Sequence, residues 1–190
     1  MEEILAFLNL IFPLSPACID YLGNVVQFRR VEKNELILDF GEVNHNLYFI
    51  KTGFLRCYYM VYKKEVNDWF FFNNETVVSI GSFYQQLPSQ DRIVAEMAGE
   101  LYFITRDQYE YAKRTFHEFA YIASFLLEKY LVTFHDHARI LRKYRALERY
   151  KMVLTKYPEM VRRIALRALA SWLNMKAETL SRARAKYGRK

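Results

Sequence analysis

Three residues near the end of the sequence have the types and spacing needed to read the edges of DNA bases. Glu178, Ser181 and Arg182 stand at positions i, i+3 and i+4, so a helix would place them on one face. A carboxylate can accept a hydrogen bond from cytosine N4, a guanidinium can donate two to guanine O6 and N7, and a serine hydroxyl can bond a base or a phosphate. The pattern predicts a helix that enters a major groove.

The charge around these residues favours that interpretation over a solvated ion pair. Residues 139–190 contain 16 lysines and arginines against three acids, whereas the rest of the chain is net acidic although the whole carries +7. A surface helix ordinarily mixes its signs, so the bias indicates a polyanionic partner, with DNA or RNA ahead of a membrane surface. The alternative, an exposed Glu178–Arg182 ion pair worth about 0.3–0.5 kcal/mol, stays open at this point.

Residues 161–186 also have the pattern of two helices joined by a tight turn. Ala170 supplies the small residue that a steep helix crossing needs, and Asn174 can adopt the positive φ of the turn. Apolar residues suited to fill the space between the helices are Leu169, Leu173, Met175, Leu180 and Ala183. The predicted phosphate contacts are Arg162, Arg163, Arg167, Lys176, Arg184 and Lys186.

The elements before this motif predict an α+β protein with an N-terminal antiparallel β-roll of the jelly-roll type. Two short helices are expected first, over residues 4–12 and 16–22, the second with Ser15 as its cap. Between residues 25 and 104, eight short apolar runs rich in Tyr, Phe, Val and Ile alternate with turn-formers, including Gly53 and Ala98-Gly99.

A single long helix of about 38 Å is expected after the roll. It carries an apolar residue every three or four positions: Phe116, Ala120, Ala123, Leu127, Tyr130, Phe134, Ala138 and Leu141. A second apolar set lies on its other side, so one side can cover the roll and the other a second copy of the same helix. A core helix packed within one subunit is the alternative.

These features divide the chain into a roll over residues 1–113, a dimerisation helix and hinge over 114–145, and a helix-turn-helix domain over 146–190. The hinge falls near residues 142–145, and the helix after it is expected to stop at Pro158.

The order of these parts, with Ala177-Glu178-Thr179-Leu180-Ser181-Arg182, resembles the Crp-Fnr family of cyclic-AMP receptor and fumarate–nitrate regulators. The segment from Tyr48 to Arg56 is similar to the family's roll with its glycine turn, and Ala146 to Tyr150 to the helix leading into its DNA-binding domain. The resemblance covers nearly the whole chain. It implies a homodimeric transcription regulator that binds pseudo-palindromic double-stranded DNA, with RNA polymerase as a further partner and an effector in the roll.

The effector pocket implied by the resemblance would include Gly81, Ser82, Phe83 and Arg92. The family's cyclic-nucleotide binders have Gly-Glu there, followed about ten residues later by Arg-Ser/Thr-Ala, whereas this sequence has Gly81-Ser82 and Arg92-Ile93-Val94. Aligned instead on the strand ending at Ile104, Ser89 or Gln90 replaces the arginine. No cyclic nucleotide is therefore expected, and without the family's cysteine ligands no iron–sulfur cluster.

Two further departures concern the DNA-binding domain. Lys176 stands where the family usually has a Ser or Thr cap, which costs the helix about 1 kcal/mol. Six residues follow Arg184, too few for the family's β-hairpin wing, so its backbone contacts would come from the tail at residues 188–190 or be absent.

Other classes of protein fit the sequence less well. A metal-dependent enzyme in a β-barrel needs several histidines with a carboxylate, but only His45 falls in the strand region, so neither a metal site nor an enzyme is expected. Cys18 and Cys57 predict buried free thiols. The acidic start and the lack of a long apolar run predict a cytoplasmic protein with no membrane contact. A signalling or protein-interaction roll without specific DNA readout is the remaining alternative.

Overall fold

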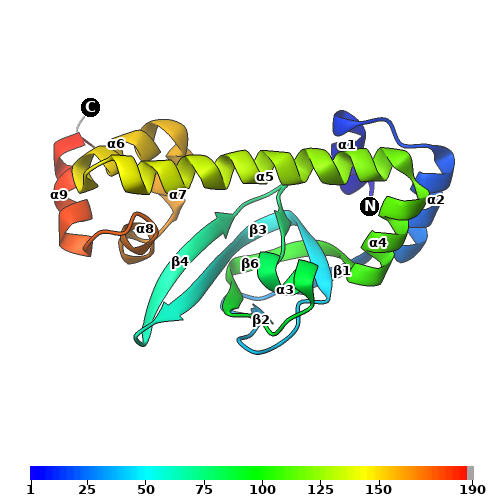
Figure 1. Ribbon diagram of the computed structural model, residues 1–190, viewed down its shortest axis with the longest axis horizontal. Coiled ribbons are helices and arrows are strands. Elements are labelled where there is room, and N and C mark those ends of the chain that lie inside the picture. The colour runs from blue at the N-terminus through cyan, green and yellow to red at the C-terminus, as the bar shows by residue number, and fades with distance from the viewer. Residues whose placement is uncertain (188–190) are drawn as a thin grey trace. The chain divides into compact units, whose positions relative to one another are not determined.

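The computed structural model describes residues 1–187, which form two compact units. The first combines Met1–Cys57 with Phe70–Lys129, and the second combines Tyr58–Trp69 with the chain from Tyr130 onward. The fold is α+β, with an antiparallel sheet and a C-terminal helical region (Figure 1). In the described residues, no helix is both long enough and apolar enough to cross a bilayer.

The sheet is built mainly on two long strands that the sequence divided into shorter ones. The strand order is β1-β6-β3-β4, with β2 beside β6 and β5 beside β3. The strand bounds are β1 Gln27–Val31, β2 Leu36–Leu38, β3 Asn46–Val61, β4 Lys64–Phe71, β5 Thr76–Val77 and β6 Asp91–Thr105. Residues 1–187 thus contain six strands rather than the expected eight.

The prediction of turns at Gly53 and Ala98-Gly99 was wrong because these glycines lie where the neighbouring strands β3 and β6 approach each other closely. A Cβ on Gly99 would lie 2.2 Å from the Thr52 carbonyl oxygen and 2.9 Å from the Gly53 Cα. Gly53 itself has φ +131°. The glycines therefore let two backbones touch inside β3 and β6, and both strands continue through the contact.

Helices of the first unit pack around an apolar core with the first half of the long helix. Their bounds are α1 Glu2–Ile11, α2 Pro16–Val25, α3 Ile80–Gln85 and α4 Arg106–Thr115. Ser15 caps α2 as predicted, because its hydroxyl accepts from the Cys18 N–H. Leu8, Leu22 and Ile122 are among the buried core residues. Cys18 and Cys57 are buried free thiols, which confirms that prediction.

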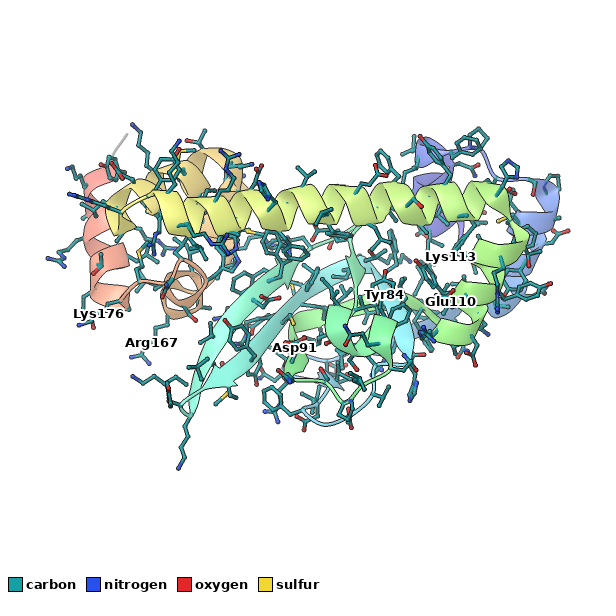
Figure 2. All side chains as sticks on the ribbon, viewed as in Figure 1. Tyr84, Asp91, Glu110, Lys113, Arg167 and Lys176 are labelled. Atoms are coloured by element: carbon teal, nitrogen blue, oxygen red, sulfur yellow. The ribbon has the colours of Figure 1, made fainter. Side chains whose placement is uncertain are left out.

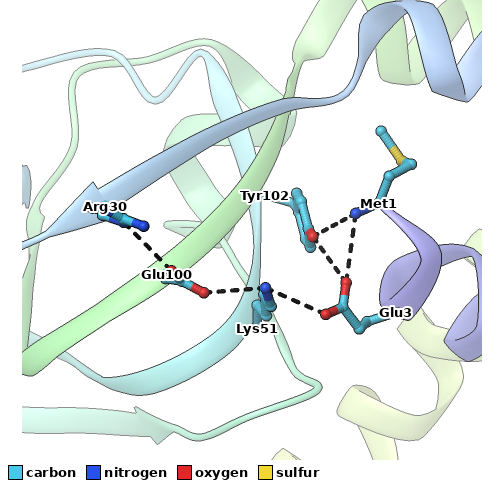
Figure 3. A network of polar contacts seen from close by, with 6 residues as sticks. All are labelled: Met1, Glu3, Arg30, Lys51, Glu100 and Tyr102. Atoms are coloured by element: carbon cyan, nitrogen blue, oxygen red, sulfur yellow. Dashed lines mark hydrogen bonds and ion pairs between the residues drawn. The ribbon is translucent and has the colours of Figure 1, made fainter.

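A polar network on the first unit joins α1 to the sheet (Figure 3). The Lys51 amino group lies 3.3 Å from the Glu3 carboxylate and 3.1 Å from the Glu100 carboxylate, and Arg30 reaches Glu100 at 3.4 Å. The pKa of Glu3 is lowered to about 2 by hydrogen bonds with the Glu3 backbone N–H and the Tyr102 hydroxyl, and by Lys51. Partly buried charges at the centre of the network thus connect the first helix with three strands.

The long helix α5 spans His117–Lys143, about 40 Å of helix. Phe116, which we expected inside it, lies outside: its backbone is extended (φ −116°, ψ 113°) and ends α4. After a break at Tyr144, the second unit continues with α6 Ala146–Lys156 and α7 Pro158–Arg163. Pro158 ends one helix and begins the next, since proline fits the first turn.

Candidate nucleic-acid interface

A tight turn joins the last two helices as the sequence predicts. Helix α8 spans Leu166–Trp172 and α9 spans Ala177–Tyr187. Asn174 has φ +49°, and its N–H donates to the Ser171 carbonyl at 2.9 Å. The Met175 N–H donates to the Ala170 carbonyl at 2.9 Å, which closes the turn over the end of α8. The positive φ expected at Asn174 is confirmed.

The apolar side chains expected between these helices are mostly inaccessible to solvent. Those with no exposed surface are Leu169, Leu173, Leu180 and Ala183, and Ala170 is almost as buried. Met175 is only half-buried. The two helices therefore share a small core that fixes α9 against α8.

The face of α9 away from this core presents the predicted base-reading residues to solvent. Glu178, Ser181 and Arg182 are all exposed, and so is Ala185 on the same face of the helix. Among residues 1–187, no ion pair joins Glu178 to Arg182. The structure therefore does not show the alternative of a Glu178–Arg182 ion pair, and both side chains face solvent.

The six predicted phosphate contacts are in unlike surroundings. Arg167 and Lys176 lie near the starts of α8 and α9 (Figure 2). Arg163 is exposed, and Arg162 forms an ion pair with Glu159. Lys186 is exposed with its amino group 5.5 Å from the Tyr187 ring centroid.

Arg184 differs from the others because its guanidinium bonds to the protein. It donates to the Val161 carbonyl at 3.1 Å and so ties α9 to α7. The tail at residues 188–190, another predicted backbone contact, lies outside the described residues.

Arg149 is a positioning residue of this site that the sequence did not single out. From α6, its guanidinium donates to the carbonyls of Leu173 and Asn174, both at 3.0 Å. Its Nε donates to the Tyr144 carbonyl at 2.8 Å. One side chain therefore joins the break before α6 to the turn before α9. Its place in a basic segment hid it, because a sequence does not distinguish an arginine bound to carbonyls from one open to phosphate.

The start of β4 is fastened to α8 within the second unit, another feature that the sequence did not predict. The Asn67 N–H donates to the Ser171 hydroxyl at 3.1 Å, and its side-chain amide to the Ala168 carbonyl at 3.2 Å. The Trp172 indole N–H donates to the Asp68 carbonyl at 3.0 Å. The Ser171 hydroxyl also donates to the Glu65 carbonyl at 3.2 Å. These four bonds hold the β3–β4 hairpin against the first helix of the turn motif.

Aromatic rings strengthen this attachment. The Trp69 ring centroid lies 5.3 Å from that of Trp172 and 4.9 Å from that of Phe134. His137 stacks on Trp172 with centroids 4.1 Å and planes 7° apart. Burial lowers the pKa of His137 to about 4, against a hydrogen bond with the Trp172 backbone that raises it. His137 is thus a neutral aromatic ring of the cluster at neutral pH.

The residues predicted for the dimer interface are distributed between interior and surface. Ala123 is buried in the core of the first unit, and the Phe116 ring lies 5.5 Å from that of Tyr21. Only Leu127 of the predicted set is exposed; the half-buried members are Ala120, Tyr130, Phe134, Ala138 and Leu141. Four apolar residues of α5 that were not in the predicted set are exposed: Tyr121, Phe125, Leu131 and Val132.

The candidate effector residues of the roll make bonds with the protein itself. Ser82 and Phe83 are buried on α3 next to Gly81, and the Ser82 hydroxyl donates to the Leu87 carbonyl at 2.7 Å while accepting from the Asn44 N–H at 2.8 Å. The Arg92 guanidinium pairs with Asp39 and lies 4.6 Å from the Phe40 ring centroid. Ser82 and Arg92 therefore bond to different parts of the roll.

A β-roll followed by a long helix and a helix-turn-helix is the fold of the Crp-Fnr transcription regulators, and comparison with solved structures shows this fold. FixK2 from Bradyrhizobium japonicum superposes with a TM-score of 0.71 at 21% identity, covering 86% of this chain and 85% of that one. The c-di-GMP-responsive global regulator CLP of Xanthomonas campestris gives 0.72 at 16% identity over 92% of both chains.

A more distant similarity is to the Thermus thermophilus catabolite activator protein, with a TM-score of 0.58 at 22% identity over 94% of this chain and 87% of that one. No protein-family model and no curated protein sequence matches the chain. The fold expected from the sequence is confirmed on structure, at identities too low to carry function with it.

Proposed function

We propose that this chain is a homodimeric, sequence-specific DNA-binding transcription regulator of the Crp-Fnr type. The observation that carries the proposal is the exposed face of α9, on which Glu178, Ser181 and Arg182 stand clear of the core that seats the helix. The fold shared with FixK2 and CLP supports the assignment. The concentration of basic residues after residue 139 supports a nucleic-acid partner.

The proposed readout follows from the chemistry of that face. With α9 in a major groove, Arg182 would donate two hydrogen bonds to a guanine, and Glu178 would accept one from a cytosine amino group. Arg167 and Lys176 would bind phosphates on either side and set the register of the helix. A contact of the bidentate kind discriminates against a wrong base by about 1–3 kcal/mol.

The proposed dimer forms through exposed apolar residues of α5. Leu131 is 69% exposed with Leu127 one turn before it, and Val132 is 61% exposed with Phe125 two turns before it. Exposed apolar rows of this kind on a surface helix are covered by another helix in the usual case. Two copies related by a twofold axis would then present two α9 helices to successive major grooves about 34 Å apart.

Selection of bound sequences from random duplex DNA tests the proposal, because it gives the motif, its symmetry and the half-site spacing together. We expect a pseudo-palindrome whose base preferences disappear in a Glu178→Ala, Arg182→Ala variant that remains dimeric. The matched control is Arg29→Ala, Glu35→Ala, which removes the same residue types from an ion pair of the first unit. Preferences that survive the α9 variant would contradict base readout by α9, whereas a wild-type chain without any base preference would favour a protein-interaction module.

Control of DNA binding by a small molecule in the roll remains a prediction, as does contact with RNA polymerase. If the roll is a sensor, a bound effector would change the orientation of the helix-turn-helix through α5 and the break at Tyr144. Operator affinity that is the same with and without every candidate effector would remove this part of the proposal.

A further inference from the structure

The turn between β3 and β4 is the most exposed part of the hairpin that is fastened to α8. Tyr62 and Lys63 form this turn between Val61 and Lys64 (Figure 1). The Tyr62 side chain is 96% exposed, and both lysines are exposed. Lys63 and Lys64 follow Tyr62 and Glu65 comes next, so the turn ends the hairpin with two positive charges beside a phenol and one carboxylate at its edge.

The backbone of the turn indicates that its side chains have a use. Tyr62 has φ +46° and Lys63 has φ +63°, the combination that two-residue hairpin turns of type I′ require. Asn-Gly or Asp-Gly fills these positions with little strain, whereas an aromatic and a long side chain do so at a cost in conformational energy. Strained residues with exposed functional groups concentrate at binding and catalytic sites.

The attachment to α8 determines where this turn lies within the second unit. Four hydrogen bonds join the start of β4 to α8, through Glu65, Asn67 and Asp68, five residues or fewer from the lysines. In helix-turn-helix proteins the first helix of the motif crosses the sugar–phosphate backbone while the second enters the groove. A hairpin fastened to the first helix is therefore carried toward that backbone. Arg167 and Lys176 point to the side of this unit toward which the turn extends (Figure 2).

We propose that the β3–β4 turn is a second DNA-contacting site, in which Lys63 and Lys64 bind backbone phosphates beside the helix-turn-helix and the Tyr62 hydroxyl donates to a phosphate oxygen. The proposal rests on the proposed function, since it needs α9 to be in the major groove. Lysine and tyrosine contacts of this kind set position and affinity but carry no sequence information. The turn therefore strengthens binding to every duplex without choosing among them.

Salt dependence of DNA binding distinguishes this role from base readout. Each phosphate neutralised by a lysine contributes about 0.9 to the slope of log affinity against log salt concentration. In the full chain, Lys63→Gln, Lys64→Gln is expected to make that slope shallower by roughly 2 for each hairpin engaged and to weaken binding about tenfold at moderate salt. The selected base motif is expected to stay the same.

Lys33→Gln is the matched control, because Lys33 is also an exposed lysine in a turn, between β1 and β2 of the first unit. It is expected to leave both slope and affinity unchanged. A wild-type slope in the Lys63, Lys64 variant overturns the proposal. A chain without any base preference overturns the proposed function instead, and the Glu178→Ala, Arg182→Ala variant separates the two because it is expected to lose preference while keeping the contribution of the turn.

A second variant separates DNA contact from a structural role for the turn. Tyr62→Asn, Lys63→Gly installs the residues that this backbone favours, so the melting temperature is expected to rise or stay the same while DNA affinity falls. A fall in both would show that the natural side chains stabilise the hairpin, and the proposal would be overturned. Unchanged affinity with a higher melting temperature would overturn it as well.

Discussion

At the scale of single residues, His137 couples the stability of the second unit to pH. Its ring is stacked on Trp172 and its pKa is lowered to about 4 from 6.5 by burial. As the pH falls, the unfolded chain takes up this proton at a higher pH than the folded chain does. The free energy of unfolding therefore decreases between pH 6.5 and 4, by about 3 kcal/mol in total, and is unaffected above pH 6.5.

Replacing His137 with Phe keeps an aromatic ring and removes the proton. We expect His137→Phe to have a shallower loss of stability than the wild type between about pH 6.5 and 4, measured as the free energy of unfolding in urea at several pH values. His135→Phe is the control, because His135 is an exposed histidine on the same helix. Equal pH dependence in all three proteins would show that folding does not lower the pKa of His137.

Arg149 is the second residue whose role is local and measurable. Its three hydrogen bonds to the carbonyls of Tyr144, Leu173 and Asn174 involve a charged donor, and such bonds contribute about 1.5–3 kcal/mol each at most when desolvated. Because part of this site is exposed, we expect Arg149→Met to cost about 1–3 kcal/mol in all. Lys151→Met on the same helix is the control, and chemical denaturation is the measurement; a cost below that of the control would refute the role.

Two arginines of the second unit that bond to carbonyls show where prediction from sequence ends at this scale. Asn174, Leu180 and Ala183 could be assigned because a turn demands positive φ and a helix has a fixed period. Arg149 and Arg184 could not, because their partners are carbonyls brought near by tertiary structure. An arginine in a basic segment has the same sequence signature whether it bonds to phosphate or to its own backbone.

At the scale of elements, the close approach of β3 and β6 at Gly99 is expected to be the most sensitive point of the sheet. A Cβ at residue 99 would overlap the Thr52 carbonyl, a backbone atom that cannot move alone. We expect Gly99→Ala to destabilise the protein by about 2–4 kcal/mol. The measurement is the midpoint of urea unfolding.

Gly23→Ala is expected to change stability in the opposite direction in the same experiment. Gly23 lies within α2, and a Cβ added there would have no neighbouring atom within 4 Å. Alanine is the better helix former there, so a gain of about 0.5–1 kcal/mol is expected. Similar effects at the two positions would mean that the strands do not touch at Gly99.

The strands also show why element counts are harder to predict than element types. The alternation of apolar residues indicates β-structure correctly over residues 46–61 and 91–105. A glycine in such a pattern predicts a turn, because turns are its commonest use there. Close approach of two backbones is the rarer use, and it depends on residues 46 positions apart, which no local pattern reports.

At the scale of the whole molecule, the exposed apolar residues of α5 predict a dimer that one charge should disrupt. Leu131→Lys would bury an unpaired ammonium against the partner helix, which costs several kcal/mol of association free energy. We expect at least a roughly 30-fold weaker dimer by sedimentation. Leu10→Lys is the control, since Leu10 is 87% exposed on α1.

The same variant separates assembly from DNA readout. A monomer that keeps α9 intact should bind a single half-site almost as before but lose the gain that a full palindrome provides through two linked contacts. Full-site binding that is unaffected by a loss of dimers would show that one copy suffices. A variant that stays dimeric would place the interface elsewhere on the chain.

The buried polar cluster around Ser82 determines how any ligand would bind in that part of the roll. Asn44, Ser79, Ser82 and Ser89 are each at most 5% exposed, and their hydrogen bonds already go to one another, to Asp91 and to nearby carbonyls. A ligand that binds there would replace one set of hydrogen bonds with another, so its binding would release little heat. Recognition in this part of the roll would depend on fit and on expelled water, and calorimetric titration would then show an entropic signature.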